Sequence, residues 1–227
     1  MKNKKLKNLA LSWLNSQEFL AKESTYVNYF NIISNHIIPN LGQIPINKLK
    51  KEDLILFNNK LLTNGNKKND KALSTKTVKD INSILQQILE FSELKIKVKT
   101  PKVIIKEISI FEENEMDKLL NYCLKNLNTY TLGIIICLFT GLRIGEICAL
   151  KWENIDLSKK IITIKNTILR INDVKNNKSK IIITEPKTES SYRKIPINKF
   201  LYSILKKFSQ NDNFYVLTGS NKYKEPR

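Results

Sequence analysis

The first part of the chain carries apolar residues at helical spacing. Intervals of three and four residues recur over 9–20, 26–37, 54–61 and 78–91. The last of these stretches is preceded by serine and threonine, which are favourable residues at the N-cap of a helix. The pattern predicts a compact four-helix unit over residues 1–97.

The pattern changes in residues 109–227. Helical stretches alternate there with short β-branched runs, so the fold class that we expect for the whole chain is α+β. We expect one helix that begins at residue 111 and three more at 130–140, 143–150 and 199–208. The expected strands are 161–164 (extending towards 171), 180–184 and 193–197, which predict a three-stranded antiparallel sheet, and a further short strand at 214–217.

Residues 98–108 separate the two parts. From residue 95 to residue 102 basic and apolar side chains alternate, and the stretch contains Pro101. This pattern predicts an extended basic linker, of the kind that would run along a phosphate backbone between two domains. A solvated edge strand would have the same pattern, so both interpretations stay open.

The net charge adds a partner to this picture. The 227 residues include 39 Lys and Arg against 21 Asp and Glu, a formal net charge of +18. Both halves of the sequence share the excess, which suits a protein that contacts a polyanion with several surfaces. The composition is also rich in Lys, Asn and Ile, as in proteins of A+T-rich genomes, and that bias alone raises the lysine content.

Several other classes of protein are disfavoured. The longest apolar run falls far short of the ~20 residues that span a bilayer, and the basic start lacks the apolar stretch of a signal peptide, so we expect no membrane association. The chain has three cysteines, an odd number, and none of them lies in a C-x-x-C spacing: Cys123, Cys137 and Cys148. We therefore expect free thiols in the cytoplasm, no metal site and no cofactor.

One local motif carries candidate chemistry. Gly141 allows a sharp turn after an apolar helix, and Arg143 follows in the first turn of a short one. Glu146 stands three residues further on, close enough for an ion pair. Spacing alone leaves two interpretations: an arginine that presents paired donors to a phosphate, or a structural Arg143–Glu146 pair.

The segment 140–156, TGLRIGEICALKWENID, resembles the first signature box of tyrosine recombinases of the phage-integrase kind. The N-terminal half resembles their all-α, SAM-like core-binding domain, through Thr25-Tyr26, the phrase I-I-P-N-L-G at 37–42 and S-T-K-T-V at 74–78. The resemblance implies a core-binding domain at 1–97, a linker at 98–108 and the N-terminal part of an α+β catalytic domain at 109–227.

The resemblance also implies a reaction and its residues. A tyrosine hydroxyl attacks a DNA phosphate and forms a 3′-phosphotyrosyl bond, without metal or cofactor. Arg143 matches the first catalytic arginine, and Glu146 matches the acid that orients it. Lys187, in E-P-K-T at 185–188, matches the hairpin lysine that protonates the leaving 5′-oxygen and fits that context better than Lys194.

Partners follow from the same resemblance. Double-stranded DNA is the expected ligand, with self-association or synapsis with a full-length recombinase as a further expectation. The candidate DNA contacts in the helical half are Thr25, Lys76, Thr77 and Lys79.

The sequence departs from the family in its later residues. It contains no His-x-x-Arg, its single histidine is His36, and none of its tyrosines lies in the context of the nucleophile. We therefore expect a C-terminally truncated recombinase that is inactive alone, and whether the chain counts as an enzyme stays open. The alternatives are an inactive DNA-binding fragment that occupies sites or interferes with a full-length recombinase, and a helical protein-interaction module.

Overall fold

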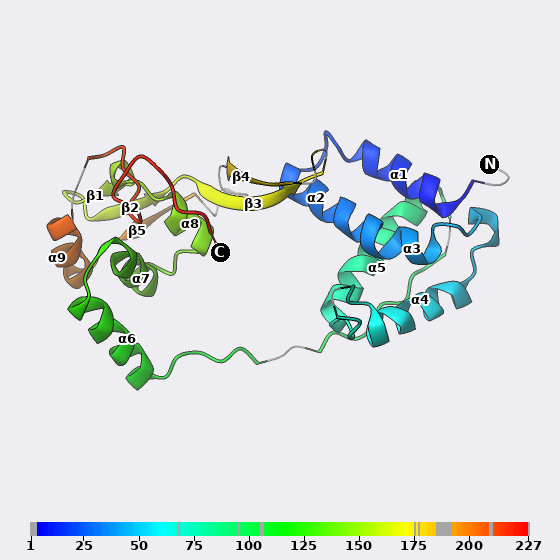
Figure 1. Cartoon of the computed structure of the whole chain (residues 1–227), viewed down its shortest axis with the longest axis horizontal. Helices are drawn as coiled ribbons and strands as arrows, with labels where there is room; N and C mark the ends of the chain where they lie inside the picture. Colours follow the sequence, from blue (N-terminus) through cyan, green and yellow to red (C-terminus); the bar gives the residue numbers. More distant parts are fainter. Residues whose placement is uncertain are drawn as a thin grey trace. The chain divides into compact units, whose positions relative to one another are not determined.

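The chain forms two compact units, Met1–Ile108 and Ser109–Arg227, each with its own hydrophobic core. They are called the N-terminal and C-terminal units below (Figure 1). The computed structural model describes residues 4–67, 69–94, 96–104, 107–174, 176, 178–184, 192–208 and 211–226.

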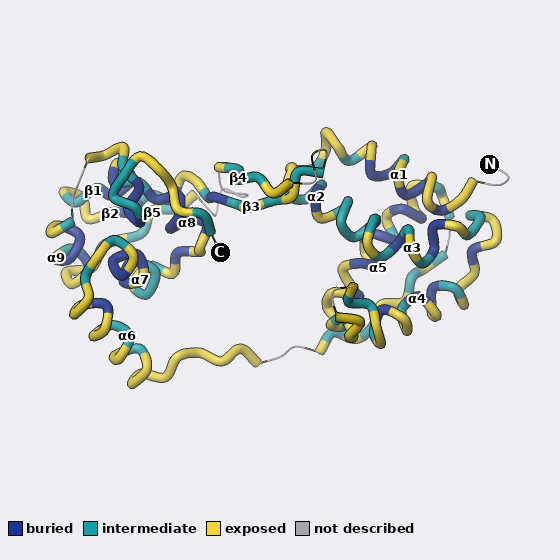
Figure 2. Tube along the Cα trace, viewed as in Figure 1, coloured by how far each residue is buried: buried dark blue, intermediate teal, exposed yellow. Residues whose placement is uncertain are grey.

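The described secondary structure of the N-terminal unit is helical. Along its helices buried and exposed residues alternate, as expected where amphipathic helices pack on one another (Figure 2). The helices are α1 (Leu6–Ser16), α2 (Glu23–Ile32), α3 (Ile38–Leu41), α4 (Lys51–Asn64) and α5 (Thr75–Phe91), with a π-helical turn at Ile33–Ile37 and a 3₁₀ turn at Ile46–Lys48.

Helix α5 supplies the central apolar stripe of this unit. Six apolar side chains of the stripe are buried: Val78, Ile81, Ile84, Leu85, Ile88 and Leu89. The expected N-cap is present, because the Ser74 hydroxyl accepts a hydrogen bond from the backbone N–H of Thr77 at 3.1 Å.

The first helix is shorter than its expected range. Helix α1 ends at Ser16, and Phe19 and Leu20 are 94% and 79% exposed in the turn that follows. Helix α2 runs through the π turn into α3, which ends at Leu41 before Gly42. Apolar spacing alone did not separate residues that pack in a helix from residues that only follow one.

The segment 96–104 lies against α4 and α5. The side-chain amide of Asn58 donates to the backbone carbonyl of Lys99 at 2.8 Å, and the N–H of Val98 donates to Gln86 Oε1 at 2.9 Å. Further along, the N–H of Ile104 donates to the Thr75 hydroxyl at 3.1 Å. Backbone groups of this segment are therefore held by helix side chains of the N-terminal unit.

The C-terminal unit is of mixed composition, so the expected α+β class is confirmed. Its helices are α6 (Glu113–Lys125), α7 (Thr129–Thr140), α8 (Ile144–Ala149) and α9 (Lys199–Phe208), with a 3₁₀ turn at Trp152–Asn154. Helix α7 packs against both α6 and α9 (Figure 1). Its strands are β1 (Ile155–Asp156), β2 (Ile161–Ile164), β3 (Thr167–Asp173), β4 (Lys178–Thr184) and β5 (Arg193–Pro196).

The strands pair differently from the expected sheet. The three-stranded antiparallel sheet has the order β1-β2-β5, and β3 and β4 form a separate antiparallel hairpin. Residues 180–184 thus belong to the hairpin, where they pair with β3. In the three-stranded sheet β1 takes their expected place, so that β2 pairs with β1 and β5. The alternation of residues 161–171 is interrupted at 165–166, where β2 ends and β3 has not begun.

The expected strand at 214–217 is replaced by turns with isolated bridges. Tyr215 pairs with Lys151 and with Ser220, and the N–H of Val216 donates to the carbonyl of Leu150 at 2.9 Å. Residues 214–217 therefore pack against the segment that follows α8 without forming a ladder.

Helix α8 lies very close to β3. A Cβ placed on Gly145 would lie 2.5 Å from Thr167 Oγ1 and 2.6 Å from the backbone oxygen of Ile168. Only glycine permits this approach, and it fixes the short helix that follows Arg143 against the base of the hairpin.

Candidate functional site

The site is built at the junction of α7 and α8. Gly141 ends α7 in the left-handed conformation, with φ of 65°, and so allows the chain to reverse. Leu142 is buried, and Arg143 follows as the N-cap residue of α8. The expected turn and the short helix are therefore present, with Arg143 just before the helix rather than within its first turn.

Glu146 is the centre of the polar contacts. Its side chain is 6% exposed and accepts four hydrogen bonds. Oε1 accepts from Nη1 of Arg143 and from Nη1 of Arg193, each at 3.0 Å. Oε2 accepts from the backbone N–H of Arg143 and from Nη2 of Arg193, each at 2.9 Å. One buried carboxylate therefore holds two arginines.

These contacts keep Glu146 ionised. Burial alone raises the pKa of a carboxyl group, but here the hydrogen bonds from Arg193 and Arg143 outweigh it and lower the pKa to about 2. The same contact with Glu146 raises the pKa of Arg193. The cluster of Arg143, Glu146 and Arg193 thus carries two positive charges and one negative charge at neutral pH.

Arg143 remains largely exposed in spite of its ion pair. Its side chain is 73% exposed, whereas that of Arg193 is 27% exposed. The ion pair expected from the i, i+3 spacing is present, and it holds the Arg143 fork through Nη1 while most of the side chain stays accessible. Such a group can donate paired hydrogen bonds to a phosphate. Its role in binding or catalysis stays a prediction.

Arg193 is the member of the cluster that the sequence did not single out. It begins β5 and pairs with Ile164 of β2 in the three-stranded sheet. Its distance of 47 residues from Glu146 removes any local spacing signal. In the sequence it is visible only as the arginine of R-K-I-P at 193–196, which no local spacing links to Glu146.

Lys187 lies outside the described residues, so its predicted role stays a prediction. The residues on either side of this segment are described. Thr184, at the end of β4, pairs with Thr167, and Arg193 pairs with Ile164. Both ends of the segment are therefore anchored on a short stretch of chain beside α8.

The candidate DNA contacts of the N-terminal unit gather mainly at one helix end. Lys76, Thr77 and Lys79 are exposed residues in the first two turns of α5. Thr25 is half-buried near the start of α2, a helix that packs against α5. Nothing in the fold contradicts a shared DNA-facing role, and that role stays a prediction.

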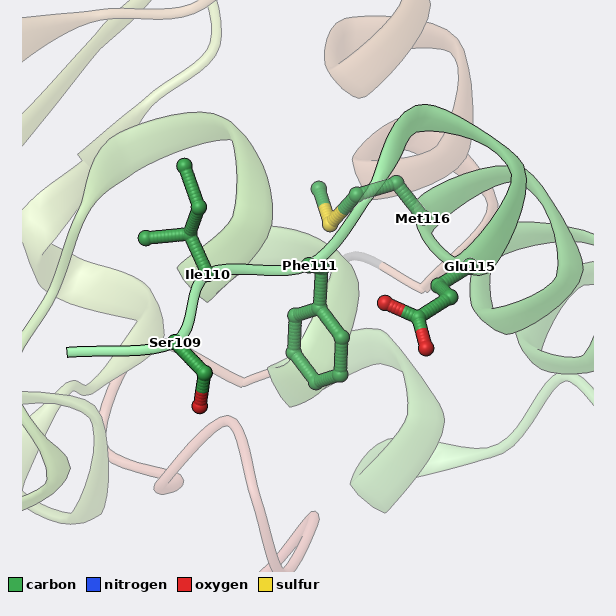
Figure 3. A pocket seen from close by; sticks show the side chains of 5 residues that line it. All are labelled: Ser109, Ile110, Phe111, Glu115 and Met116. Carbon is green, nitrogen blue, oxygen red and sulfur yellow. The ribbon is translucent and has the colours of Figure 1, made fainter. Parts of the chain in front are cut away.

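Other features of the molecule carry less chemistry. Before α6 an open hollow is lined by Ser109, Ile110, Phe111, Glu115 and Met116 (Figure 3). Its one ionisable side chain, Glu115, accepts a hydrogen bond from the backbone N–H of Glu112 at 2.9 Å and so caps α6. The hollow contains none of the site residues predicted from the sequence.

The histidine and the three cysteines are buried or half-buried and lie outside the cluster. His36 lies in the π turn, and burial, with a contribution from Lys67, lowers its pKa. All three cysteines are free, and burial raises the pKa of each thiol. Within the described ranges, no group of three or more His, Cys, Asp or Glu side chains is placed to hold a metal ion. None of the helices in that part of the chain has the length and apolar character needed to cross a bilayer.

Comparisons with known proteins cover both units. A family model described as "Phage integrase family" matches residues 109–223, and one described as "Phage integrase, N-terminal SAM-like domain" matches residues 5–62. A tyrosine recombinase XerC-like protein of Caldanaerobacter subterraneus subsp. tengcongensis is 29% identical over 220 residues, 89% of this chain and 54% of that protein. The ICEBs1 integrase of Bacillus subtilis is 25% identical over 206 residues, 87% of this chain and 52% of that protein. The chain thus spans about half the length of these curated relatives.

Solved structures share the fold. The Tn1549 transposon integrase in complex with transposon right end DNA matches with a TM-score of 0.72 and 21% identity, over 90% of this chain and 64% of that one. A lambda integrase dimer bound to a COC′ core site matches with a TM-score of 0.58 and 14% identity, over 91% of this chain and 54% of that one. The family model covers half of the chain, and the resemblance predicted from the signature box is confirmed. The chain belongs to the phage integrase family of tyrosine recombinases.

Proposed function

We propose that this chain binds double-stranded DNA and serves in DNA integration and recombination, with Arg143 holding the phosphate that is exchanged. The observation that carries the proposal is an arginine whose guanidinium is held by a buried carboxylate while its side chain is 73% exposed. Related integrases of the same fold were solved on DNA, which supports the choice of ligand. The net charge of +18 supports it as well.

The chemistry places a definite demand on Arg143. When a tyrosine hydroxyl attacks the phosphorus, negative charge gathers on the non-bridging oxygens, and fixed donors stabilise it. A 3′-phosphotyrosyl bond forms, the bond to the 5′-oxygen breaks, and Lys187 is proposed to give that oxygen a proton. We assign the nucleophile to no tyrosine of the 227 residues.

Chain length supports the inclusion of Lys187. Thr184 pairs with Thr167, the residue that contacts Gly145, two residues from Arg143. Lys187 follows Thr184 by three residues in the sequence, and this short separation supports its inclusion with Arg143 in the proposal.

The N-terminal unit is proposed to hold DNA through Thr25, Lys76, Thr77 and Lys79, and the segment 98–108 to link the two domains. Self-association on DNA is part of the proposal, because a related integrase was solved as a tetramer bound to a Holliday junction. The proposed setting is the cytoplasm, where free thiols stay reduced.

A salt series of DNA binding tests the proposal. We expect the affinity for a fluorescent mixed-sequence duplex to fall steeply with salt, and Arg143→Ala to reduce the slope of log K against log salt by about 1. Arg170→Ala is the matched control, because the guanidinium of Arg170 pairs with a different carboxylate, that of Glu225, at 3.6 Å. This control should keep the slope of the parent chain.

Two results would count against the proposal. Absence of binding even at low salt would remove nucleic acid as the ligand, and an unchanged slope in Arg143→Ala would remove the phosphate contact. A covalent band on a nicked DNA substrate would separately show that one of the eight tyrosines acts as a nucleophile.

A further inference from the structure

We propose that Arg193 is a positioning residue: acting through the carboxylate of Glu146, it fixes the guanidinium of Arg143 and keeps the cluster positive towards a DNA phosphate. The inference rests on the proposed phosphate contact of Arg143. It assigns a function to an arginine that no local sequence pattern marks.

The first step is the geometry at Glu146. A carboxylate offers about four lone-pair positions, and four hydrogen bonds occupy them here. Arg193 supplies two of them as a parallel fork, one to each oxygen, at 3.0 and 2.9 Å. Such a fork defines the plane of a carboxylate, which in glutamate otherwise rotates over a broad range. The same two oxygens hold Nη1 and the backbone N–H of Arg143.

The second step is the framework behind Arg193. Its backbone is part of β5 and pairs with β2 in the three-stranded sheet. Glu146 lies on α8, which Gly145 fixes against β3. The fork of Arg193 therefore ties the sheet to α8, and Arg143, at the N-cap of that helix, receives its position from both.

The third step is charge. With Arg193 present, the cluster has two positive charges and one negative charge. Without Arg193, the ionised Glu146 would cancel Arg143, and an approaching phosphate would meet a neutral pair. The side chain of Arg193 is 27% exposed and that of Arg143 is 73% exposed, so Arg143 is the member available to the ligand. Arg193 contributes its charge to the cluster through its contact with Glu146.

Two substitutions separate these contributions. Arg193→Gln removes both the fork and the charge. Arg193→Lys keeps the charge but replaces the planar fork with a point donor, which cannot fix the carboxylate plane in the same way. Arg193→Lys also guards against a variant that fails to fold. Arg170→Gln is the matched control, because it removes a guanidinium with a carboxylate partner, Glu225, elsewhere in the same unit.

The first experiment needs no DNA. The chain contains four arginines, so ¹⁵N-arginine labelling gives a small set of Nε–Hε signals that can be assigned by substitution. In the parent chain the Arg143 signal should show hindered rotation of its guanidinium. We expect Arg193→Gln and Arg193→Lys to free that rotation, and Arg170→Gln to leave it unchanged. Backbone amide signals of α7 and α9, followed in a second, uniformly ¹⁵N-labelled sample, should stay in place in all three variants. An Arg143 signal that does not respond to either Arg193 variant overturns the proposal.

The second experiment measures DNA affinity in a double-mutant cycle. The affinity lost in the double variant Arg193→Gln/Arg143→Ala should differ from the product of the two single losses. We expect a coupling factor of about threefold or more, beyond the roughly twofold scatter of independent sites. The cycle of Arg170→Gln with Arg143→Ala should show no coupling, and Arg193→Lys should weaken binding less than Arg193→Gln. Losses that multiply in the Arg193 cycle would contradict the proposal. If Arg143→Ala itself leaves affinity unchanged, the proposed function is wrong, whereas the NMR comparison still decides whether Arg193 positions Arg143.

Discussion

Replacing Glu146 with glutamine tests the stability of the cluster directly. The variant keeps the size of the side chain, but it removes the charge and points an amide N–H₂ at arginine donors. A carboxyl pKa that falls from 4.5 to about 2 on folding corresponds to roughly 3 kcal/mol at pH 7, at about 1.4 kcal/mol per tenfold change in proton affinity. The side chain is only 6% exposed, so solvent screening reduces this figure little. We expect Glu146→Gln to lower the free energy of unfolding of the C-terminal unit by about 3 kcal/mol.

The pH dependence follows from the direction of the pKa change. Because folding lowers the pKa of Glu146, its contribution is complete above the unfolded value of 4.5 and is lost as the pH falls towards about 2. The difference between the parent chain and Glu146→Gln should therefore stay near 3 kcal/mol from pH 7 to pH 5.5 and shrink to about 1.5 kcal/mol at pH 3.

Urea unfolding followed by tryptophan fluorescence measures this difference. The chain has two tryptophans, both buried, with Trp152 in the C-terminal unit and Trp13 in the N-terminal unit. A Trp13→Phe background leaves Trp152 as the reporter. The control is Glu153→Gln, whose carboxylate is 3.9 Å from Lys151 and whose side chain is 46% exposed, so it should change stability by less than about 0.5 kcal/mol. If Glu146→Gln unfolds like this control, or if its deficit does not change between pH 7 and pH 3, the account of the cluster is wrong.

Two further predictions concern the packing around the cluster. Gly145→Ala should destabilise the C-terminal unit by about 1–3 kcal/mol in the same assay, because its Cβ would meet the backbone of Ile168; Gly133→Ala, whose Cβ meets the flexible end of Leu217, should cost less. Burial, followed by Cys148 and Glu146, raises the pKa of Cys137 to about 11. Its alkylation by iodoacetamide at pH 8, followed by mass spectrometry, should be roughly 100-fold slower than that of an unperturbed cysteine, and equal rates would refute the assigned environment.

The helices could be predicted from the sequence because each depends on local spacing. The stripe of α5 and its Ser74 cap lie within one continuous segment, and so does the apolar run of α7 that Gly141 ends. Strand pairing depends on distant segments. The alternation over 161–171 showed β structure, but it did not reveal that one part pairs with β1 and β5 and the other with β4. The interruption at 165–166 separates the two strands, and the partner of each strand depends on the segments that pack on either side of it.

The site shows the same division between local and distant information. The Arg143–Glu146 contact follows from a spacing of three residues, and the sequence offered a structural ion pair and a phosphate-binding arginine as rival interpretations. They are compatible, because Glu146 has a second guanidinium 47 residues away to balance its charge. A carboxylate paired with a single arginine would cancel the charge of that arginine. A carboxylate shared by two arginines fixes the exposed one and leaves the cluster with a net positive charge. Since Arg193 reaches Glu146 only through the pairing of β5 with β2, the charge available to a phosphate is set by the tertiary fold rather than by the signature box that contains Arg143.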